Sequence, residues 1–248
     1  SMPAGAARNA IDCALWDLEA HRQQTPVWRL LGLASAPGEC HTMRTVSIDT
    51  PNAMAAAATA LAGASTLKVK VGGDADIARL EAVHQAVPEA GIVVDANESW
   101  TVRQLESWLP RLSELGVVVL EQPLPAGQDE ALAEMRGQIP LCADESCHDR
   151  GSFADVVGRY DMVNVKLDKA GGLTEAIAVV REAQDRGLEL MIGCMVSTSL
   201  AVAPALLLAE QASFVDLDGP FLLERDRDAA PHDVRASLLR SSAAVWGA

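Results

Sequence analysis

The stretch Ile92-Val93-Val94-Asp95-Ala96-Asn97 joins a short apolar, β-branched run to a carboxylate and an amide. Such a run is typical of a parallel strand that is buried on both faces and carries polar side chains at its carboxyl end. The pattern recurs at residues 117–121, which end on Glu121, and at residues 140–144, which end on Asp144. Three strands in succession that each end on a carboxylate predict a shared site at one edge of the sheet.

The predicted site contains oxygen ligands and lacks neighbouring Cys or His ligands. A single acidic residue after a strand is usually only solvated. Acidic residues at the ends of three successive strands instead favour a metal site at Asp95, Glu121 and Asp144. Carboxylate oxygens suit a hard divalent cation, so we expect Mg²⁺, with Mn²⁺ as a substitute.

Composition excludes several classes of function. A formal charge of −14 without a basic stripe argues against binding to nucleic acid. Neither an apolar run of membrane-spanning length nor an export signal is present in the sequence, so a membrane partner is not expected. The five cysteines are odd in number and lack CxxC spacing, which favours reduced thiols in a cytoplasmic protein. The sequence leaves a homo-oligomer open.

Apolar strand cores alternate with helical patterns along the chain. The cores lie near residues 46, 69, 94, 119, 142, 165, 191 and 215, and the helical patterns include 7–23, 74–87, 102–115, 173–186 and 197–211. Regularly spaced strand cores could also indicate a leucine-rich solenoid, but the sequence contains no leucine-rich repeat pattern, so a solenoid is disfavoured. The alternation predicts an α/β fold, a TIM-like (β/α)7β barrel, with the amphipathic helix 7–23 covering the remaining groove. The expected parts are an exit helix and connector at 1–40, the barrel at 41–225 and a C-terminal extension at 226–248.

Lysine is scarce, and its positions are informative. Of 20 basic residues only four are lysines, namely Lys68, Lys70, Lys166 and Lys169. Arginine cannot deprotonate in a protein, so lysine is expected where an amine must titrate. Alternation along a strand places Lys68 and Lys70 on one face of the second strand, and Lys166 lies on the sixth. Amines on both sides of a metal-bound carboxylate can move a proton off and onto an acidic carbon, with Lys70 and Lys166 as the two bases.

Asp216 and Asp218, at the end of the eighth strand, predict a substrate ammonium as their partner.

The ordered set Lys68-Val-Lys70, Asp95-Ala-Asn97, Glu121-Gln-Pro123, Asp144-Glu-Ser146, Lys166 and Asp216-Leu-Asp218-Gly-Pro220 resembles the muconate-lactonising branch of the enolase superfamily, and within it the dipeptide epimerases. The resemblance implies Mg²⁺-dependent epimerisation of a dipeptide of the L-Ala-Glu type, in murein peptide recycling. It implies that Lys70 and Lys166 are the catalytic bases and that Lys68, Asp216 and Asp218 bind substrate. It also implies that Asp95, Glu121 and Asp144 bind the metal, with Asn97 and Glu145 orienting them.

Family members begin with a capping domain, whereas this sequence opens at what resembles that domain's exit helix. Four other readings stay open at this stage. They are an N-acylamino acid racemase or an o-succinylbenzoate synthase of the same superfamily, a Schiff-base aldolase with Lys166 as nucleophile, and a non-catalytic barrel without a cap.

Overall fold

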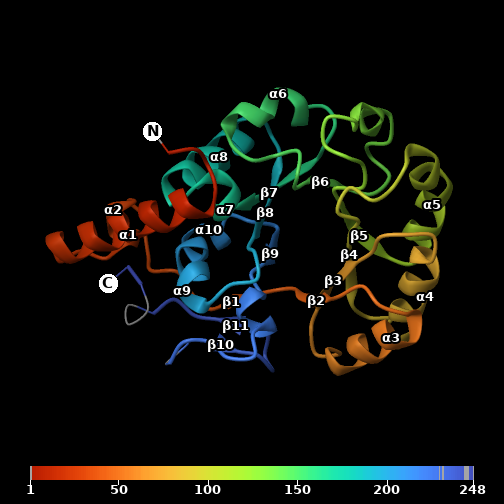
Figure 1. Cartoon of the computed structure of the whole chain (residues 1–248), viewed down its shortest axis with the longest axis horizontal. Coiled ribbons are helices and arrows are strands. Elements are labelled where there is room, and N and C mark those ends of the chain that lie inside the picture. Colours follow the sequence, from red (N-terminus) through yellow and green to blue (C-terminus); the bar gives the residue numbers. More distant parts are fainter. Residues whose placement is uncertain (1, 229, 231, 243–245, 248) are drawn as a thin grey trace. The chain divides into compact units, whose positions relative to one another are not determined.

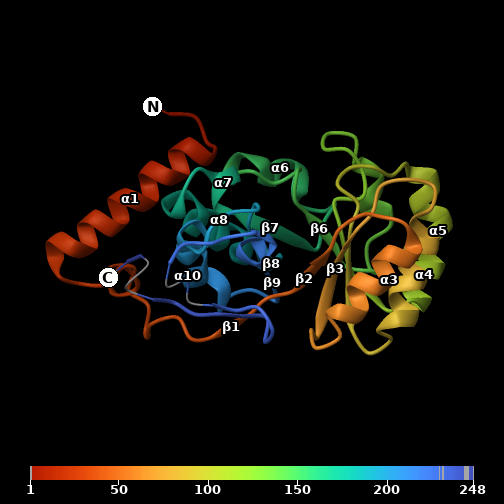
Figure 2. The ribbon, with the colours of Figure 1, turned by 60° about the horizontal axis from the view of Figure 1, so that its bottom comes forward.

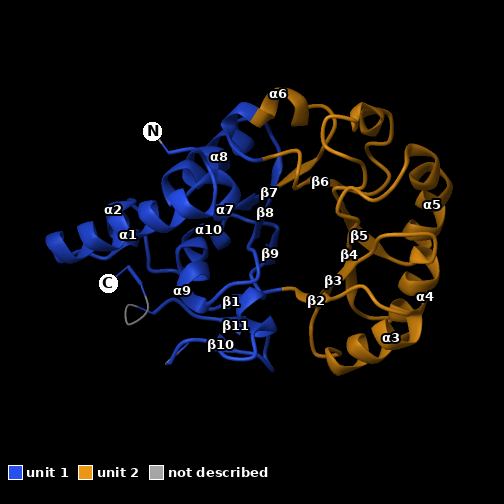
Figure 3. Cartoon of the chain, in the orientation of Figure 1, with its two compact units in different colours: residues 1–42, 148–151, 164–248 blue, residues 43–147, 152–163 orange. Residues whose placement is uncertain are grey.

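The computed structural model describes residues 2–228, 230, 232–242 and 246–247. Contacts divide the chain into two compact units, which Figure 3 colours separately. Unit 1 comprises Ser1–Thr42, His148–Gly151 and Asn164–Ala248, and unit 2 comprises Met43–Cys147 and Ser152–Val163.

Unit 2 repeats strand and helix in alternation (Figure 1). Its elements are β2 (Arg44–Val46), α3 (Pro51–Ala60), β3 (Thr66–Lys70), α4 (Asp76–Ala86), β4 (Gly91–Asp95), α5 (Val102–Glu114), β5 (Val117–Glu121), the 3₁₀ helix η1 (Glu130–Glu134), β6 (Leu141–Ala143), α6 (Phe153–Val156) and the first residues of β7 (Met162–Lys166). Within unit 2, α3, α4 and α5 lie side by side along one side of β3, β4 and β5 (Figure 2).

Unit 1 holds both ends of the chain. Its elements are α1 (Ala6–Gln23), α2 (Val27–Leu30), β1 (Cys40–His41), η2 (Arg150–Ser152, which ends at the unit boundary), α7 (Leu167–Ala170), α8 (Leu173–Asp185), β8 (Glu189–Gly193), α9 (Ser199–Val202), η3 (Ala203–Ala205), α10 (Leu206–Ala209), β9 (Phe214–Asp216), η4 (Gly219–Leu222), β10 (His232–Asp233) and β11 (Leu238–Leu239). Strands β1, β11 and β10 form a small antiparallel sheet, which the sequence did not predict.

The strands β2 to β9 form one eight-stranded sheet in chain order, and every pairing described between neighbours is parallel. All eight predicted strand cores fall in or directly beside these strands. In β4 the side chains of Ile92, Val93 and Val94 are fully buried, as expected for a strand covered on both faces. The α/β, TIM-like fold predicted from the sequence is confirmed.

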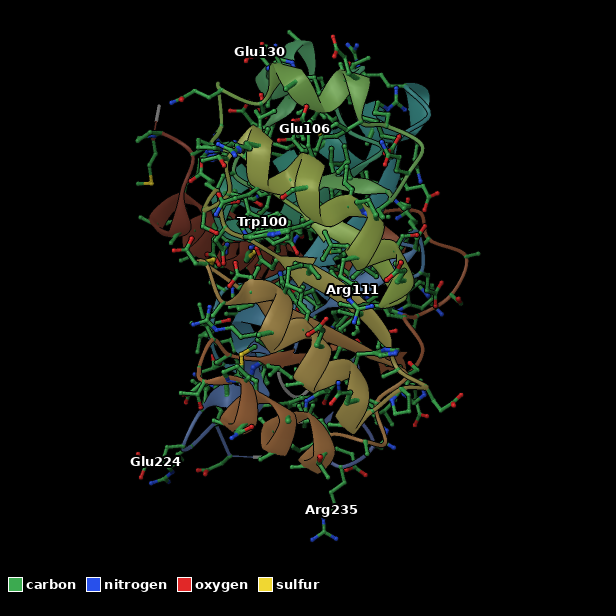
Figure 4. All side chains as sticks on the ribbon, turned by 90° about the vertical axis from the view of Figure 1, so that its right-hand side faces the viewer. Trp100, Glu106, Arg111, Glu130, Glu224 and Arg235 are labelled. Carbon is green, nitrogen blue, oxygen red and sulfur yellow. The ribbon has the colours of Figure 1, made fainter. Side chains whose placement is uncertain are left out.

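Helix α5 shows how the local sequence fixes an element. Thr101 and Gln104 form a capping box at its start, where each side chain bonds to the other residue's backbone N–H. Leu105, Leu109 and Leu112 recur on one face and are buried. Glu106 and Arg111, which flank this buried face on its two sides, are exposed (Figure 4).

One helical prediction needs correction, and a second is confirmed with its apolar face exposed. The pattern at 197–211 is not one helix but α9, η3 and α10 in succession, because Pro204 lacks the N–H that a continuous helix would use. Helix α1 is confirmed, yet its apolar side chains Ile11, Leu15 and Leu18 are 50%, 58% and 53% exposed. Polar contacts instead fasten α1, such as the hydrogen bond of 2.9 Å from Trp16 Nε1 to Thr174 Oγ1.

The five cysteines all lie within the described residues, and none of them forms a disulfide bond there. None of the helices in the described part of the chain is both long and apolar enough to cross a membrane.

Candidate active site

The ends of three neighbouring strands in unit 2 bring charged side chains together. Lys70 is paired in register with Asp95, and Asp95 with Glu121, so these residues lie on adjacent strands at the same height. Lys68 lies two residues before Lys70 and shares its face. The side chains of Lys68, Asp95 and Glu121 are almost completely buried, whereas that of Lys70 is 38% exposed. An amine that solvent or substrate can reach is thus fixed beside a buried carboxylate.

Two ammonium groups share the Asp95 carboxylate. Lys68 Nζ lies 3.2 Å and Lys70 Nζ lies 2.9 Å from Asp95 Oδ2. Burial alone would raise the pKa of Asp95, but the charges of Lys68 and then Lys70 outweigh it and hold this pKa below its ordinary value. Asp95 is therefore ionised at neutral pH.

Lys68 also contacts the next strand. Its Nζ lies 2.8 Å from Glu121 Oε2 and 3.1 Å from Glu121 Oε1, so one buried cation lies between two carboxylates. Among the described residues, no group of three or more His, Cys, Asp or Glu side chains is arranged to hold a metal ion. Asp144 is nevertheless buried, and its charge contributes to the raised pKa of Glu145 and partly opposes the lowering of the pKa of Asp95 by the two lysines. Asp95 and Glu121 together thus attract a cation, which in this structure is the Lys68 ammonium, and their hard oxygens are of the kind that also suits Mg²⁺.

Asn97 and Glu145 connect the loops that follow β4 and β6. Lys70 Nζ donates to Asn97 Oδ1 at 2.8 Å, and Asn97 Nδ2 donates to Glu145 Oε1 at 3.1 Å. Asn97 N also donates to Asp95 Oδ1 at 3.1 Å, with Asn97 in the left-handed region at φ 40°. Burial and then repulsion from Asp144 raise the pKa of Glu145. The chain thus carries an acidic side chain whose charged form is disfavoured.

Replacing Glu145 with glutamine is expected to stabilise the metal-free protein at pH 7. The pKa of Glu145 is raised in the folded state, so its charged form opposes folding at neutral pH, and this penalty is absent below its unfolded pKa of about 4.3. Thermal unfolding with a chelator present should show a higher Tm for Glu145→Gln at pH 7 and no difference near pH 4. If wild type and Glu145→Gln have the same Tm at pH 7 as well as near pH 4, the charged form of Glu145 does not oppose folding.

The sequence prediction missed Asp76, which joins the loops after β3 and β4. Its buried carboxylate accepts hydrogen bonds from Gly72 N and Gly73 N at 3.0 Å each, and from Arg79 Nη1 and Trp100 Nε1 at 2.8 Å each. Trp100 in turn packs edge-on against Trp108. The sequence signal that could have identified Asp76 was an acidic residue in the first turn of a helix, shortly after two glycines.

Removal of the Asp76 carboxylate is expected to destabilise the protein strongly. In Asp76→Ala, buried donors lose their partner, so the free energy of unfolding should fall by about 3 kcal/mol or more. Urea unfolding followed by tryptophan fluorescence measures this. Asp76→Asn keeps one acceptor oxygen and should lose less. Equal stability of wild type and Asp76→Ala would show that these bonds contribute nothing net.

A second group of predicted site residues lies in unit 1. Lys166 ends β7, Asp216 ends β9, and Asp218 follows two residues later; all three are buried. The charges of all three act on Cys194, whose N–H donates to Asp216 O at 3.1 Å. Burial and then Asp216 raise the pKa of the Cys194 thiol to about 12, Asp218 adds to this, and Lys166 opposes it. Cys194 was not predicted as part of the site, because only the fold reveals its neighbours.

Comparisons with known proteins define the class. Residues 52–240 match the family model described as enolase C-terminal domain-like, and residues 1–32 match the N-terminal domain model of mandelate racemase and muconate lactonizing enzyme. The chain therefore belongs to the enolase superfamily, in its mandelate racemase and muconate-lactonising branch, as the motifs predicted.

Its relatives are racemases and epimerases. The chain is 50% identical to N-acetyl-D-glutamate racemase of Pseudoalteromonas sp over 92% of this chain and 71% of the relative. It is 51% identical to L-Ala-D/L-Glu epimerase of Escherichia coli K12 over 92% of this chain and 72% of that enzyme. These similarities make the chain an isomerase of the kind that acts on amino acid derivatives.

Solved structures of related proteins agree with this family assignment. An enolase family member from Agrobacterium tumefaciens with homology to dipeptide epimerases, containing bound sodium and L-Ala-L-Glu, matches with a TM-score of 0.94 and 44% identity over 99% of this chain and 75% of that one. The dipeptide epimerase of Enterococcus faecalis V583, in complex with Mg and L-Leu-L-Tyr, matches with a TM-score of 0.89 and 33% identity over 100% of this chain and 73% of that one.

Proposed function

We propose that this protein catalyses the Mg²⁺-dependent epimerisation of a dipeptide of the L-Ala-D/L-Glu type at the α-carbon of its C-terminal residue. The observation that carries the proposal is that Lys68 contacts both Asp95 and Glu121 while Lys70 contacts Asp95, at the ends of successive strands. Relatives that epimerise such dipeptides support the substrate class. Recycling of murein peptides is the corresponding role.

Asp95, Glu121 and Asp144 are the residues that would hold Mg²⁺, with Mn²⁺ as a substitute. When bound, the ion would stabilise the negative charge that develops on the substrate carboxylate as the α-proton leaves. Lys68 would bind the substrate carboxylate, and its ammonium, held on Asp95 and Glu121, keeps a positive charge beside the proposed metal ligands. Asn97 and Glu145 orient Lys70 and the Asp144 loop.

Lys70 and Lys166 are the proposed bases. Lys70 is the reachable amine in unit 2, and Lys166 ends β7 in unit 1. One lysine, in its neutral form, takes the α-proton, and the other, in its protonated form, returns one to the opposite face of the planar carbanion. This 1,1-proton transfer inverts the stereocentre without net consumption of protons.

Asp216 and Asp218 are the proposed partners of the dipeptide's free ammonium. Both are buried carboxylates whose charges act on Cys194, as that of Lys166 also does. A buried pair of like charges is stabilised by a cation, which a free amino terminus provides.

N-acylamino acid racemisation is the second candidate, favoured by the 50% identity to N-acetyl-D-glutamate racemase. Its substrate lacks the ammonium and therefore needs neither Asp216 nor Asp218. An o-succinylbenzoate synthase likewise has no use for them, and a Schiff-base aldolase would be trapped on Lys166 by borohydride. A non-catalytic barrel would bind Mg²⁺ without exchanging any α-proton.

The test is incubation of L-Ala-L-Glu and, separately, N-acetyl-L-glutamate with Mg²⁺ in D₂O, followed by NMR. We expect deuterium at the α-carbon of the dipeptide's C-terminal residue together with inversion. Exchange of N-acetyl-glutamate alone would replace the proposal with the second candidate. Absence of exchange from both would reject proton transfer.

A further inference from the structure

Gln122 lies at the centre of a buried polar cluster in unit 2 that the proposed chemistry does not use directly. It follows Glu121 at the end of β5 and has a left-handed backbone at φ 36°. Its Oε1 accepts hydrogen bonds from Asp144 N at 2.9 Å and from Ser146 N at 3.0 Å. One side-chain oxygen therefore holds the backbone on both sides of Glu145.

The orientation of the Gln122 amide is fixed by its partners. Backbone N–H groups only donate, so the atom facing Asp144 and Ser146 must be the carbonyl oxygen. Gln122 Nε2 donates to Leu124 O at 2.9 Å and lies 2.9 Å from both Ser146 Oγ and Tyr160 Oη. One of the two Nε2 hydrogens serves Leu124 O, so the two hydroxyl oxygens share the other, and their own hydrogens must point elsewhere.

Asp129 is where those hydroxyl hydrogens point. Its Oδ2 accepts from Ser146 Oγ and from Tyr160 Oη at 2.6 Å each, and its Oδ1 accepts from Arg159 Nη1 at 2.7 Å. Asp129 is 1% exposed. Burial would raise its pKa, but the bonds from Ser146, Tyr160 and Arg159 outweigh this and keep it below the ordinary value. Burial and Asp129 also raise the pKa of Tyr160, so the phenol remains a donor.

We propose that Asp129 is a positioning residue that fixes the Asp144-to-Ser146 segment through Ser146, Tyr160 and Gln122. The carboxylate sets the direction of both hydroxyls, the hydroxyls then accept from the Gln122 amide, and the opposite end of that amide holds the backbone of Asp144. The effect on metal binding rests on the proposed function, in which Asp144 is a ligand, whereas the effect on the segment's backbone does not. Partners of this kind typically change metal affinity by about 10-fold to 100-fold.

Asp129→Asn tests this, because its amide has one acceptor oxygen where the carboxylate has two, so it cannot accept from the two hydroxyls and from Arg159 together. The matched control is Asp155→Asn, which removes an exposed carboxylate 3.8 Å from Arg159 Nη2. The first measurement is amide hydrogen exchange of the segment 141–147 in the metal-free protein. We expect exchange at least about 10-fold faster in Asp129→Asn and unchanged in Asp155→Asn. Equal exchange in all three proteins overturns the proposal.

The second measurement is Mg²⁺ affinity by calorimetry, for which we expect a dissociation constant raised about 10-fold in Asp129→Asn. Faster exchange with unchanged Mg²⁺ affinity would keep Asp129 as a positioning residue and reject Asp144 as a ligand. If the wild type shows no epimerase activity but Asp129→Asn still exchanges faster than the wild type, only the proposed function is rejected. If Asp129→Asn does not fold, Tyr160→Phe decides by the same exchange measurement, because it removes one hydroxyl and keeps the ring.

Discussion

Lys70→Arg and Lys166→Arg are each expected to lose epimerisation by about 10² to 10⁴-fold, the usual contribution of a positioned acid or base. Arginine keeps the positive charge, so the contact with Asp95 is retained at position 70, but it cannot become neutral and accept a proton. The loss therefore reports base function and not charge. Turnover of L-Ala-L-Glu with Mg²⁺, followed by NMR or chiral chromatography, measures it.

Isotope exchange separates the two bases. In D₂O, each variant should still exchange the α-proton of the one epimer that faces its remaining lysine, and neither should convert one epimer into the other. Lys169→Arg is the matched control, since Lys169 donates to the Asn164 carbonyl at 2.9 Å and an arginine can also donate there. A single variant that still interconverts both epimers would refute the two-base mechanism.

Unit 2 shows how much of the site a sequence can predict. Asp95 and Glu121 were predictable because β4 and β5 are apolar runs that stop on acids, and parallel pairing in register brings those ends together. Lys68 was expected to bind substrate, but its buried contacts with both carboxylates come from tertiary packing. The roles of Asp76 and Asp129 could not be predicted, because their partners come from several loops and no periodicity links them.

Helix α1 marks another limit of pattern reading. Its spacing predicted a helix correctly, but periodicity only shows which residues share a face and not what that face contacts. In the structure the face of Ile11, Leu15 and Leu18 is about half exposed, and contacts such as Trp16 with Thr174 hold the helix instead. Local pattern thus determined the element, while tertiary contacts determined its orientation.

Glu121→Gln is expected to destabilise the metal-free protein by about 3 kcal/mol, because it leaves a buried ammonium without its nearer carboxylate. Lys68 Nζ lies 2.8 Å from Glu121 Oε2, and the remaining carboxylate, Asp95, is already shared with Lys70. Urea unfolding in the presence of a chelator gives the free energy of unfolding. The exposed ion pairs of Arg111 with Glu81 and Glu114 provide the control, and Arg111→Gln should cause no measurable change.

The double variant Lys68→Met/Glu121→Gln distinguishes an unpaired charge from a loss of packing. Methionine retains most of the apolar stem of Lys68 but removes its charge, while Asp95 keeps Lys70 as its partner. We therefore expect the double variant to regain at least about half of the stability lost in Glu121→Gln, so that the two substitutions are strongly non-additive. If their effects simply add, Lys68 and Glu121 are not coupled. The cation-accepting position inferred between Asp95 and Glu121 would then lose its energetic basis, and with it the main argument that Mg²⁺ binds there.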